Sequence, residues 1–216
     1  MPFLTRLELI RKIKLLKSKS LSIAFLGPDG SGKSTIISSL LQKGIPFDST
    51  HYFHLKPLLQ KSEKKEIVVT NPHASSPYGA IKSYIKLLVF VYQYNMGWLR
   101  NIRPLRKKKS LVIFDRYYDD LLVDHRRYLY GGAISIAKFI RNFIPKPDLY
   151  FILTADAKII FARKQEVNFE ELERQIKGYK ALGNERRYYN INVNRIPDEI
   201  VAEVKQIILK ATDETN

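Results

Sequence analysis

The sequence predicts a three-layer α/β fold, in which a parallel β-sheet carries helices on both of its faces. Short apolar segments rich in branched and aromatic residues alternate along the chain with longer segments whose apolar residues recur at helical spacing. This alternation is typical of a parallel sheet, because a chain that leaves one strand needs a helical crossover to enter the next. A length of 216 residues and a hydrophobic content of 45% fit one such domain with a substantial core.

The predicted elements follow one another from residue 21 to the end of the chain. Strands are expected at residues 21–26, 50–54, 66–70, 111–115, 149–153 and 189–193. Helices are expected at residues 35–42, 80–100, 134–144, 156–164 and 169–182, and from residue 197 onward.

Local signals support the individual elements. The strands at 111–115 and 149–153 are short, rich in branched or aromatic residues, and sharply bounded. Pro197 opens the last helix, and the acidic residues of its first turn match the helix dipole. Residues 80–100 are apolar almost all round, so this helix should be buried or line a pocket. The basic run at 103–109 should be a solvated loop.

A glycine-rich motif follows the first predicted strand directly. Residues 27–34 match the pattern G-x-x-x-x-G-K-[ST], and the strand before them and the helix after them supply the context that a phosphate-binding loop needs. A glycine turn that merely caps a helix is the alternative. In a phosphate loop, Lys33 places a cation between the β- and γ-phosphates of ATP, and the Ser34 hydroxyl suits Mg²⁺. The motif predicts a P-loop fold with ATP and Mg²⁺ as cofactors, held by Gly27, Pro28, Asp29, Gly30, Ser31, Gly32, Lys33, Ser34 and Thr35.

A second motif ends the predicted strand at 111–115. Asp115 would stand at the carboxyl end of this strand, where ligands bind in open α/β sheets. Its carboxylate can support Mg²⁺, and the planar fork of Arg116 can clamp a phosphate. A surface salt bridge is the alternative for the pair. Lys33, Asp115 and Arg116 are therefore candidate catalytic residues, and Ser34 and Asp115 are candidate metal ligands.

Together, the phosphate loop, the run Asp-Arg-Tyr at 115–117 and the segment Pro-Asp-Leu-Tyr at 147–150 resemble the thymidylate kinase family of nucleoside monophosphate kinases, from about residue 21 to 210. The resemblance implies a P-loop kinase domain at 21–212 with a lid at about 163–180. It implies that Arg163 in this lid stabilises the transferring phosphoryl group, as a further catalytic residue. Lys164 and Arg174 are weaker lid candidates. The resemblance also implies that Asp29 contacts the sugar hydroxyl of the acceptor.

The acceptor half of the family pattern is less complete. The family's Arg-Glu-Pro segment after the third strand is Thr-Asn-Pro at 70–72 here, so an expected arginine is missing. Arg126 and Arg127 could replace this clamp. The position of the family's base-reading arginine falls at about Tyr94, and Phe90 could stack on a base or simply belong to the core. The candidate substrate-binding residues are Asp29, Phe90, Tyr94 and Arg116.

Three functions remain open. The first is Mg·ATP-dependent transfer of the γ-phosphate to a nucleoside monophosphate such as dTMP. The second is phosphorylation of a hydroxyl on a sugar or glycolipid, which needs a carboxylate as a base. Spare carboxylates for that role are Asp29, Asp119, Asp120 and Asp124. The third is a polyanion-binding module switched by ATP, although no motif for reading nucleic acid is present, so a small-molecule acceptor is the expected partner.

The net charge of +16 is unevenly distributed. Residues 1–20 carry six basic residues and one acidic residue beside apolar residues at helical spacing. This basic amphipathic segment either packs on the domain, which we favour, or contacts a membrane surface. The chain has no cysteine, no secretory signal and no apolar stretch of membrane-spanning length, so we expect it in the cytoplasm. A homodimer is left open, and Mg²⁺ is the one metal implied.

Overall fold

The computed structural model describes residues 20–42, 44–58, 73 and 75–214. Two expectations therefore lie outside the described residues, namely the basic segment at 1–20, apart from Ser20, and the strand at 66–70. In the described part of the chain, no helix is both long and apolar enough to cross a bilayer.

The centre of the molecule is a sheet of five parallel strands in the order β2-β3-β1-β4-β5. The strands are β1 (Leu21–Leu26), β2 (Ser49–His54), β3 (Ser110–Asp115), β4 (Leu149–Thr154) and β5 (Tyr188–Asn192). In the middle strand, Phe25 pairs with Asp115 on one side and with Phe151 on the other. The predicted parallel α/β fold is confirmed, with strand bounds that differ from the prediction by about one residue.

The helices lie in the connections between successive strands, except for α9, which follows the last strand. They are α2 (Lys33–Gln42), α3 (Ala80–Gly97), the π-helix η1 (Trp98–Ile102), α4 (Arg103–Leu105), α5 (Asp119–Val123), α6 (Ile134–Ile140), the 3₁₀ helix η2 (Arg141–Phe143), α7 (Ala157–Arg163), α8 (Phe169–Leu182) and α9 (Pro197–Glu214). The basic run at 103–109 thus begins with a short helix before it becomes a loop. The prediction also missed α5, whose acidic first turn is too short to give a helical period.

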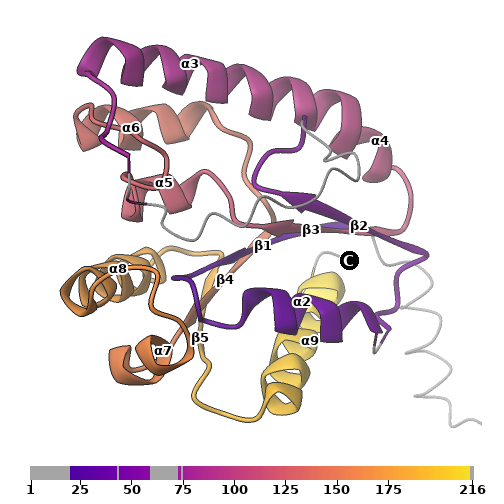
Figure 1. The fold of residues 1–216 in the computed structure, drawn as a ribbon. Coiled ribbons are helices and arrows are strands. Elements are labelled where there is room, and N and C mark those ends of the chain that lie inside the picture. The colour runs from indigo at the N-terminus through magenta and orange to yellow at the C-terminus, as the bar shows by residue number, and fades with distance from the viewer. Residues whose placement is uncertain (1–19, 43, 59–72, 74, 215–216) are drawn as a thin grey trace, which may run out of the picture.

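Two apolar clusters pack against the sheet, one on each face, and each is covered by one of the two layers of helices in Figure 1. Alternate residues of β1 contribute to different clusters, because successive side chains of a strand point to opposite faces of the sheet. Ile23 belongs to the cluster under α2 and α9, whereas Ala24 belongs to the cluster under α3, α5 and α6. All six residues of β1, β3 and β4 are buried, as expected for strands covered on both faces.

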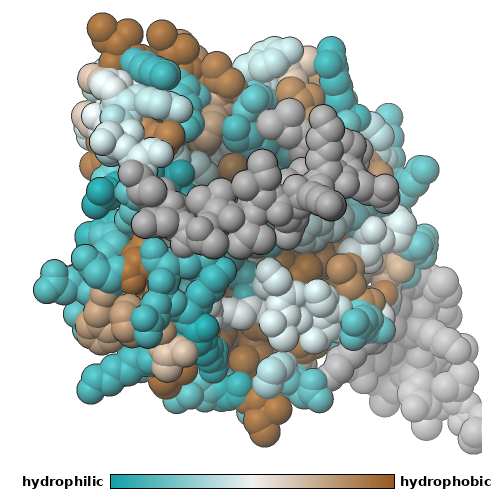
Figure 2. All heavy atoms as spheres, viewed as in Figure 1, coloured by the Kyte–Doolittle hydropathy of each residue, from teal (hydrophilic) through white to brown (hydrophobic). Residues whose placement is uncertain are grey.

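Helix α3 is buried on one side only, whereas its apolar sequence led us to expect that it would be buried or line a pocket. Leu87 is 1% exposed and lies against the sheet, whereas Ile81 is 79% exposed and Leu88 63% exposed on the opposite side. Figure 2 shows brown, apolar side chains gathered at the upper left of the molecule, where the first turns of α3 lie. The cause is geometric, because a single helix on the outside of a sheet can turn only one stripe toward the core.

The strand order places the carboxyl ends of β1 and β3 side by side. The main-chain N–H of Arg116, just after β3, donates to the carbonyl of Phe25 in β1 at 3.0 Å. The N–H of Leu55, just after β2, donates to the carbonyl of Asp115 at 3.0 Å. The glycine-rich motif, the Asp-Arg pair and the end of β2 therefore meet at one edge of the sheet, where open α/β sheets bind ligands.

Candidate active site

The glycine-rich motif forms a tight loop between β1 and α2. Gly27, Gly30 and Gly32 have φ angles of 145°, 81° and 82°, in the region that favours glycine. A Cβ atom on Gly27 would lie 2.4 Å from the carbonyl oxygen of Leu153, so a side chain is excluded there by contact as well. The loop leads into the first turn of α2, whose free N–H groups make an anion-binding site.

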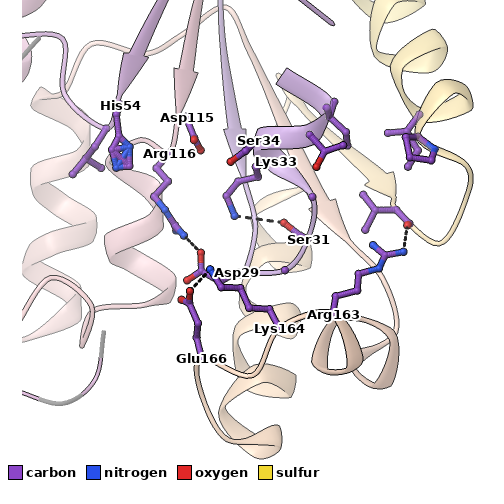
Figure 3. A pocket seen from close by; sticks show the side chains of 18 of the residues that line it. Asp29, Ser31, Lys33, Ser34, His54, Asp115, Arg116, Arg163, Lys164 and Glu166 are labelled. Atoms are coloured by element: carbon purple, nitrogen blue, oxygen red, sulfur yellow. Dashed lines mark hydrogen bonds and ion pairs between the residues drawn. The ribbon is translucent and has the colours of Figure 1, made fainter. Parts of the chain in front are cut away.

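Lys33 is buried at the start of α2, with its ammonium group inside the loop. Its Nζ donates to the carbonyl oxygens of Gly27 at 2.7 Å and Pro28 at 2.9 Å. It also lies 3.5 Å from Oγ of Ser31, the contact drawn in Figure 3. Burial, together with the charge of the nearby Arg116, lowers the pKa of Lys33 from 10.5 to about 7, against the opposing effect of Asp115. A group in this position gains from an anionic ligand, because the ligand would replace the solvation that burial has removed.

Asp115 ends β3 beside the loop. It is 8% exposed, and its Oδ2 accepts a hydrogen bond from the hydroxyl of Tyr52 at 3.0 Å. Its Oδ1 is buried and has no hydrogen-bond partner among the described residues. A buried carboxylate oxygen without a partner is costly, so this atom fits a ligand such as a cation or a hydroxyl proton. Ser34 lines the same cavity, which places the two candidate metal ligands on one site.

Arg116 follows with a strained backbone. Its φ of 71° is rare for a residue with a side chain, and the hydrogen bond from its N–H to β1 holds it in this conformation. The turn directs its guanidinium to Asp29 of the phosphate loop, where Nη2 contacts Oδ1. Burial alone would lower the pKa of Arg116, but Asp120, whose carboxylate lies 3.6 Å away, raises it.

Asp29 belongs to the phosphate loop and also forms ion pairs with two arginines of the site. Its second oxygen, Oδ2, contacts Nη2 of Arg127. The same Nη2 lies 3.1 Å from Oε2 of Glu166, in the segment between α7 and α8, and Nε lies 3.1 Å from Oδ2 of Asp124. The predicted acceptor contact of Asp29 remains a prediction.

A cavity of about 1000 Å³ joins these groups. Its walls contain most of the predicted loop together with Asp115, Arg116 and Arg127. Sequence reasoning did not identify several of the lining residues, because they belong to no recognised motif; four of them are polar or aromatic. They are Tyr52 and His54 of β2, Tyr128, and Arg195 before α9.

Arg163 lines the cavity on its other side (Figure 3). It is exposed, and its guanidinium donates to the carbonyl of Val193 at 3.1 Å, turned away from Asp115 and Arg116. Lys164 also lines the cavity and pairs with Glu166. Arg174 is not among the lining residues and donates to the carbonyl of Val123 at 2.9 Å.

The segment predicted as a lid, about 163–180, contains two kinds of structure. Residues 164–168 form a short connection, with Asn168 capping α8 through a hydrogen bond to the N–H of Glu171 at 2.9 Å. Arg163 ends α7, and the remaining residues belong to α8, which buries Leu172 and Tyr179 in the two apolar clusters.

Phe90 and Tyr94 do not line the cavity, contrary to their expected place in the acceptor pocket. Phe90 is 2% exposed and Tyr94 is not exposed, because both face the sheet and pack edge-on within a cluster of aromatic rings. The hydroxyl of Tyr94 donates to the carbonyl of Leu55 at 2.8 Å. The Nζ of Lys56 lies 4.0 Å from the centre of the Phe90 ring and covers one of its faces.

One further group of possible metal ligands occurs beside the site. His73, Asp124 and Glu171 bring one ligand atom each within 4.8 Å of one another. Arg127 pairs with Asp124 and Arg174 pairs with Glu171 in the same place. Both carboxylates already have cationic partners, so the group is an ion-pair network and carries no metal assignment.

Known proteins of similar sequence are thymidylate kinases. No family model matches the chain. A probable thymidylate kinase from Pyrobaculum aerophilum is 28% identical over 208 residues, covering 86% of this chain and 95% of that protein. Probable thymidylate kinase 1 from Saccharolobus solfataricus is 26% identical over 207 residues, covering 87% and 96%.

Solved structures of similar fold are also thymidylate kinases. The enzyme from Ehrlichia chaffeensis has a TM-score of 0.58 at 19% identity, covering 88% of this chain and 99% of that one. The enzyme from Candida albicans has a TM-score of 0.60 at 16% identity, covering 91% and 94%. These structures support the fold, while the sequence relatives support the family to which the two motifs pointed.

Proposed function

Since the chain belongs to the thymidylate kinase family and is a kinase, we propose that it transfers the γ-phosphoryl group of ATP, with Mg²⁺, to a nucleoside monophosphate such as dTMP. The observation that carries the proposal is the meeting of the phosphate loop with Asp115 and Arg116 in one cavity of about 1000 Å³. The loop presents main-chain N–H groups and a buried lysine on one side, and the pair presents a carboxylate and a guanidinium on the other.

Each group has a chemical role in this proposal. The N–H groups at the start of α2 bind the β-phosphate, and Lys33 neutralises the charge that develops between the β- and γ-phosphates. Arg116 contributes a guanidinium that binds phosphate oxygens at the site of transfer. Mg²⁺, when bound, withdraws charge from the β- and γ-phosphate oxygens. Ser34 and the unpaired oxygen of Asp115 are the residues that would hold it.

The rest of the kinase domain completes the proposal. Residues 21–212 act as one kinase domain, and the lid at about 163–180 acts through the connection at 164–168. Arg163 lines the same cavity and is proposed to stabilise the transferring phosphoryl group, although its guanidinium is turned toward Val193 rather than toward Asp115. Peripheral membrane contact through residues 1–20 and a homodimer are additional proposals, which binding to vesicles and sedimentation would test.

A turnover screen tests the function directly. Purified protein with Mg·ATP would be offered dTMP, other nucleoside monophosphates, free nucleosides and simple sugars, and the formation of ADP and phosphorylated product would be measured. We expect turnover of at least one monophosphate and little with the uncharged acceptors. Turnover confined to sugars or nucleosides would refute the proposed acceptor class but not the kinase activity. Folded protein that forms no product from any acceptor would refute the proposal altogether.

A further inference from the structure

A single guanidinium connects three separate parts of the candidate site. Arg127 contacts Asp29 of the phosphate loop, lies 3.1 Å from Asp124 at the end of α5, and lies 3.1 Å from Glu166 between α7 and α8. Its side chain is 19% exposed and lines the cavity. Arg127 carries one positive charge and is paired with three carboxylates. An incoming anion can therefore replace one of these carboxylates while the other two keep Arg127 in place.

The carboxylate of Asp29 occupies a fork made by two arginines. Arg116 contacts its Oδ1 and Arg127 contacts its Oδ2, one oxygen each. This is also the arrangement in which two guanidinium groups bind two oxygens of a phosphate. The fork opens into the cavity that contains Lys33 and the unpaired oxygen of Asp115. Asp29 thus stands where the phosphate of an acceptor would find its complementary charge.

The chain holds Arg127 firmly in this place. Asp124, which is 2% exposed, accepts hydrogen bonds from both the main-chain N–H of Arg127 at 3.2 Å and its side-chain Nε at 3.1 Å. Leu129, two residues later, has a φ of 51°, so the loop is bent by a strained residue as well. A guanidinium fixed before the ligand arrives loses little entropy on binding.

Its neighbour Arg126 has none of these properties. Arg126 is exposed and lines a separate, smaller cavity with His73 and Asn168. The two arginines are adjacent in sequence and equal in charge, but only Arg127 reaches the cavity that holds the phosphate loop. The structure therefore separates two residues that the sequence could not.

We propose that Arg127 is the acceptor-binding residue that takes the place of the arginine missing from residues 70–72, and that it binds the acceptor's phosphate in exchange for Asp29. The inference rests on the proposed function, because it requires an acceptor that carries a phosphate. A phosphate brings more negative charge than a carboxylate, so it competes successfully for the two arginines. Glu166, in the connection between α7 and α8, contacts the same Nη2 of Arg127 as Asp29 does. A phosphate that replaces Asp29 would therefore also lie beside this connection.

Equilibrium binding of dTMP and of thymidine, which differ by the phosphate alone, tests the inference. Titration calorimetry would compare the wild type with Arg127→Ala, Arg127→Lys and the matched control Arg126→Ala, each checked for folding by its thermal transition. We expect Arg127→Ala to weaken dTMP binding at least tenfold, which is about 1.4 kcal/mol. Arg127→Lys should retain part of the affinity, and Arg126→Ala all of it. Thymidine, measured as a competitor of dTMP, should bind equally to all four proteins.

The outcomes separate the inference from the function. If the wild type phosphorylates dTMP and Arg127→Ala binds it as tightly, the inference is wrong and the proposed function stands. An equal loss of dTMP and thymidine affinity in Arg127→Ala would mean that the residue only supports the structure, which also overturns the inference. Wild-type protein that neither binds nor phosphorylates any nucleoside monophosphate would overturn both.

Discussion

The charge of Lys33 should destabilise the protein when no anion is bound, and its removal should therefore stabilise the fold while abolishing catalysis. The informative substitution is Lys33→Met, which keeps the length and the buried methylene groups but removes the ammonium group. Lys33 is 7% exposed, and its pKa falls from 10.5 to about 7 on folding, chiefly because of burial. In the pH range between these two values the unfolded chain binds a proton that the folded protein has lost, so stability rises with pH.

The magnitude follows from the same two values. One pKa unit corresponds to roughly 1.4 kcal/mol. The cost of burying the charge is thus on the order of 4 kcal/mol at pH 7 and about 2 kcal/mol at pH 9, and it vanishes above pH 10.5. The two hydrogen bonds from Nζ to loop carbonyls oppose this gain, since each is worth about 1 kcal/mol. We expect Lys33→Met to be more stable than the wild type at pH 7 by roughly 2 kcal/mol, with the difference shrinking as pH rises.

Urea unfolding at pH 7, 8 and 9, without nucleotide, measures this difference, and a turnover assay at pH 7 measures the loss of catalysis. Subtracting the wild-type curve from that of the variant cancels the titration of all other groups. A variant that is less stable than the wild type at pH 7 would show that the ammonium group stabilises the folded protein, contrary to the expectation. A difference independent of pH would contradict the depressed pKa, and retained turnover would remove Lys33 from the site.

Three other outcomes are expected, two from the structure and the last from the sequence of residues 1–18. Asp115→Asn keeps the hydrogen bond from Tyr52 but removes the charge at the unpaired oxygen. Turnover should therefore fall about 100-fold, while the urea midpoint changes little. Unchanged turnover would exclude Asp115 from catalysis. Gly27→Ala should lower the free energy of unfolding in urea by about 2 kcal/mol or more beyond the loss in the control Gly44→Ala. Both glycines have a positive φ, but only at Gly27 would the added Cβ collide with another residue, the carbonyl oxygen of Leu153. Equal losses of stability would contradict this close contact. Deletion of residues 1–18 should weaken sedimentation with anionic vesicles more than it lowers turnover, and unaltered vesicle binding would dismiss the proposed membrane contact.

The fold and the phosphate loop were accessible to sequence reasoning because their signals are local. The loop at 27–34 has a fixed spacing, and the buried strands β1, β3 and β4 are continuous apolar runs between sharp breaks. Asp115 was equally accessible, since it ends such a run. In each case the residues that carry the signal are neighbours in the sequence, so no knowledge of packing was required.

The acceptor half depends on long-range contacts instead. The pairing of Asp29 with Arg127 joins residues 98 positions apart, and nothing in the sequence separates Arg127 from Arg126. Phe90 was misplaced for a related reason, because an apolar helix with two candidate stripes does not reveal which stripe faces the sheet. The burial of Phe90 follows from the rotation of α3, which is set by packing.

The ammonium group over the Phe90 ring has a consequence for how this protein would tell one acceptor from another. A flat ring could stack on this face of Phe90 only by displacing the cation of Lys56, which lies 4.0 Å from the ring centre. Phe90 is also 2% exposed and lies outside the lining of the cavity. Contacts to the heterocycle of an acceptor therefore fall to other side chains than Phe90.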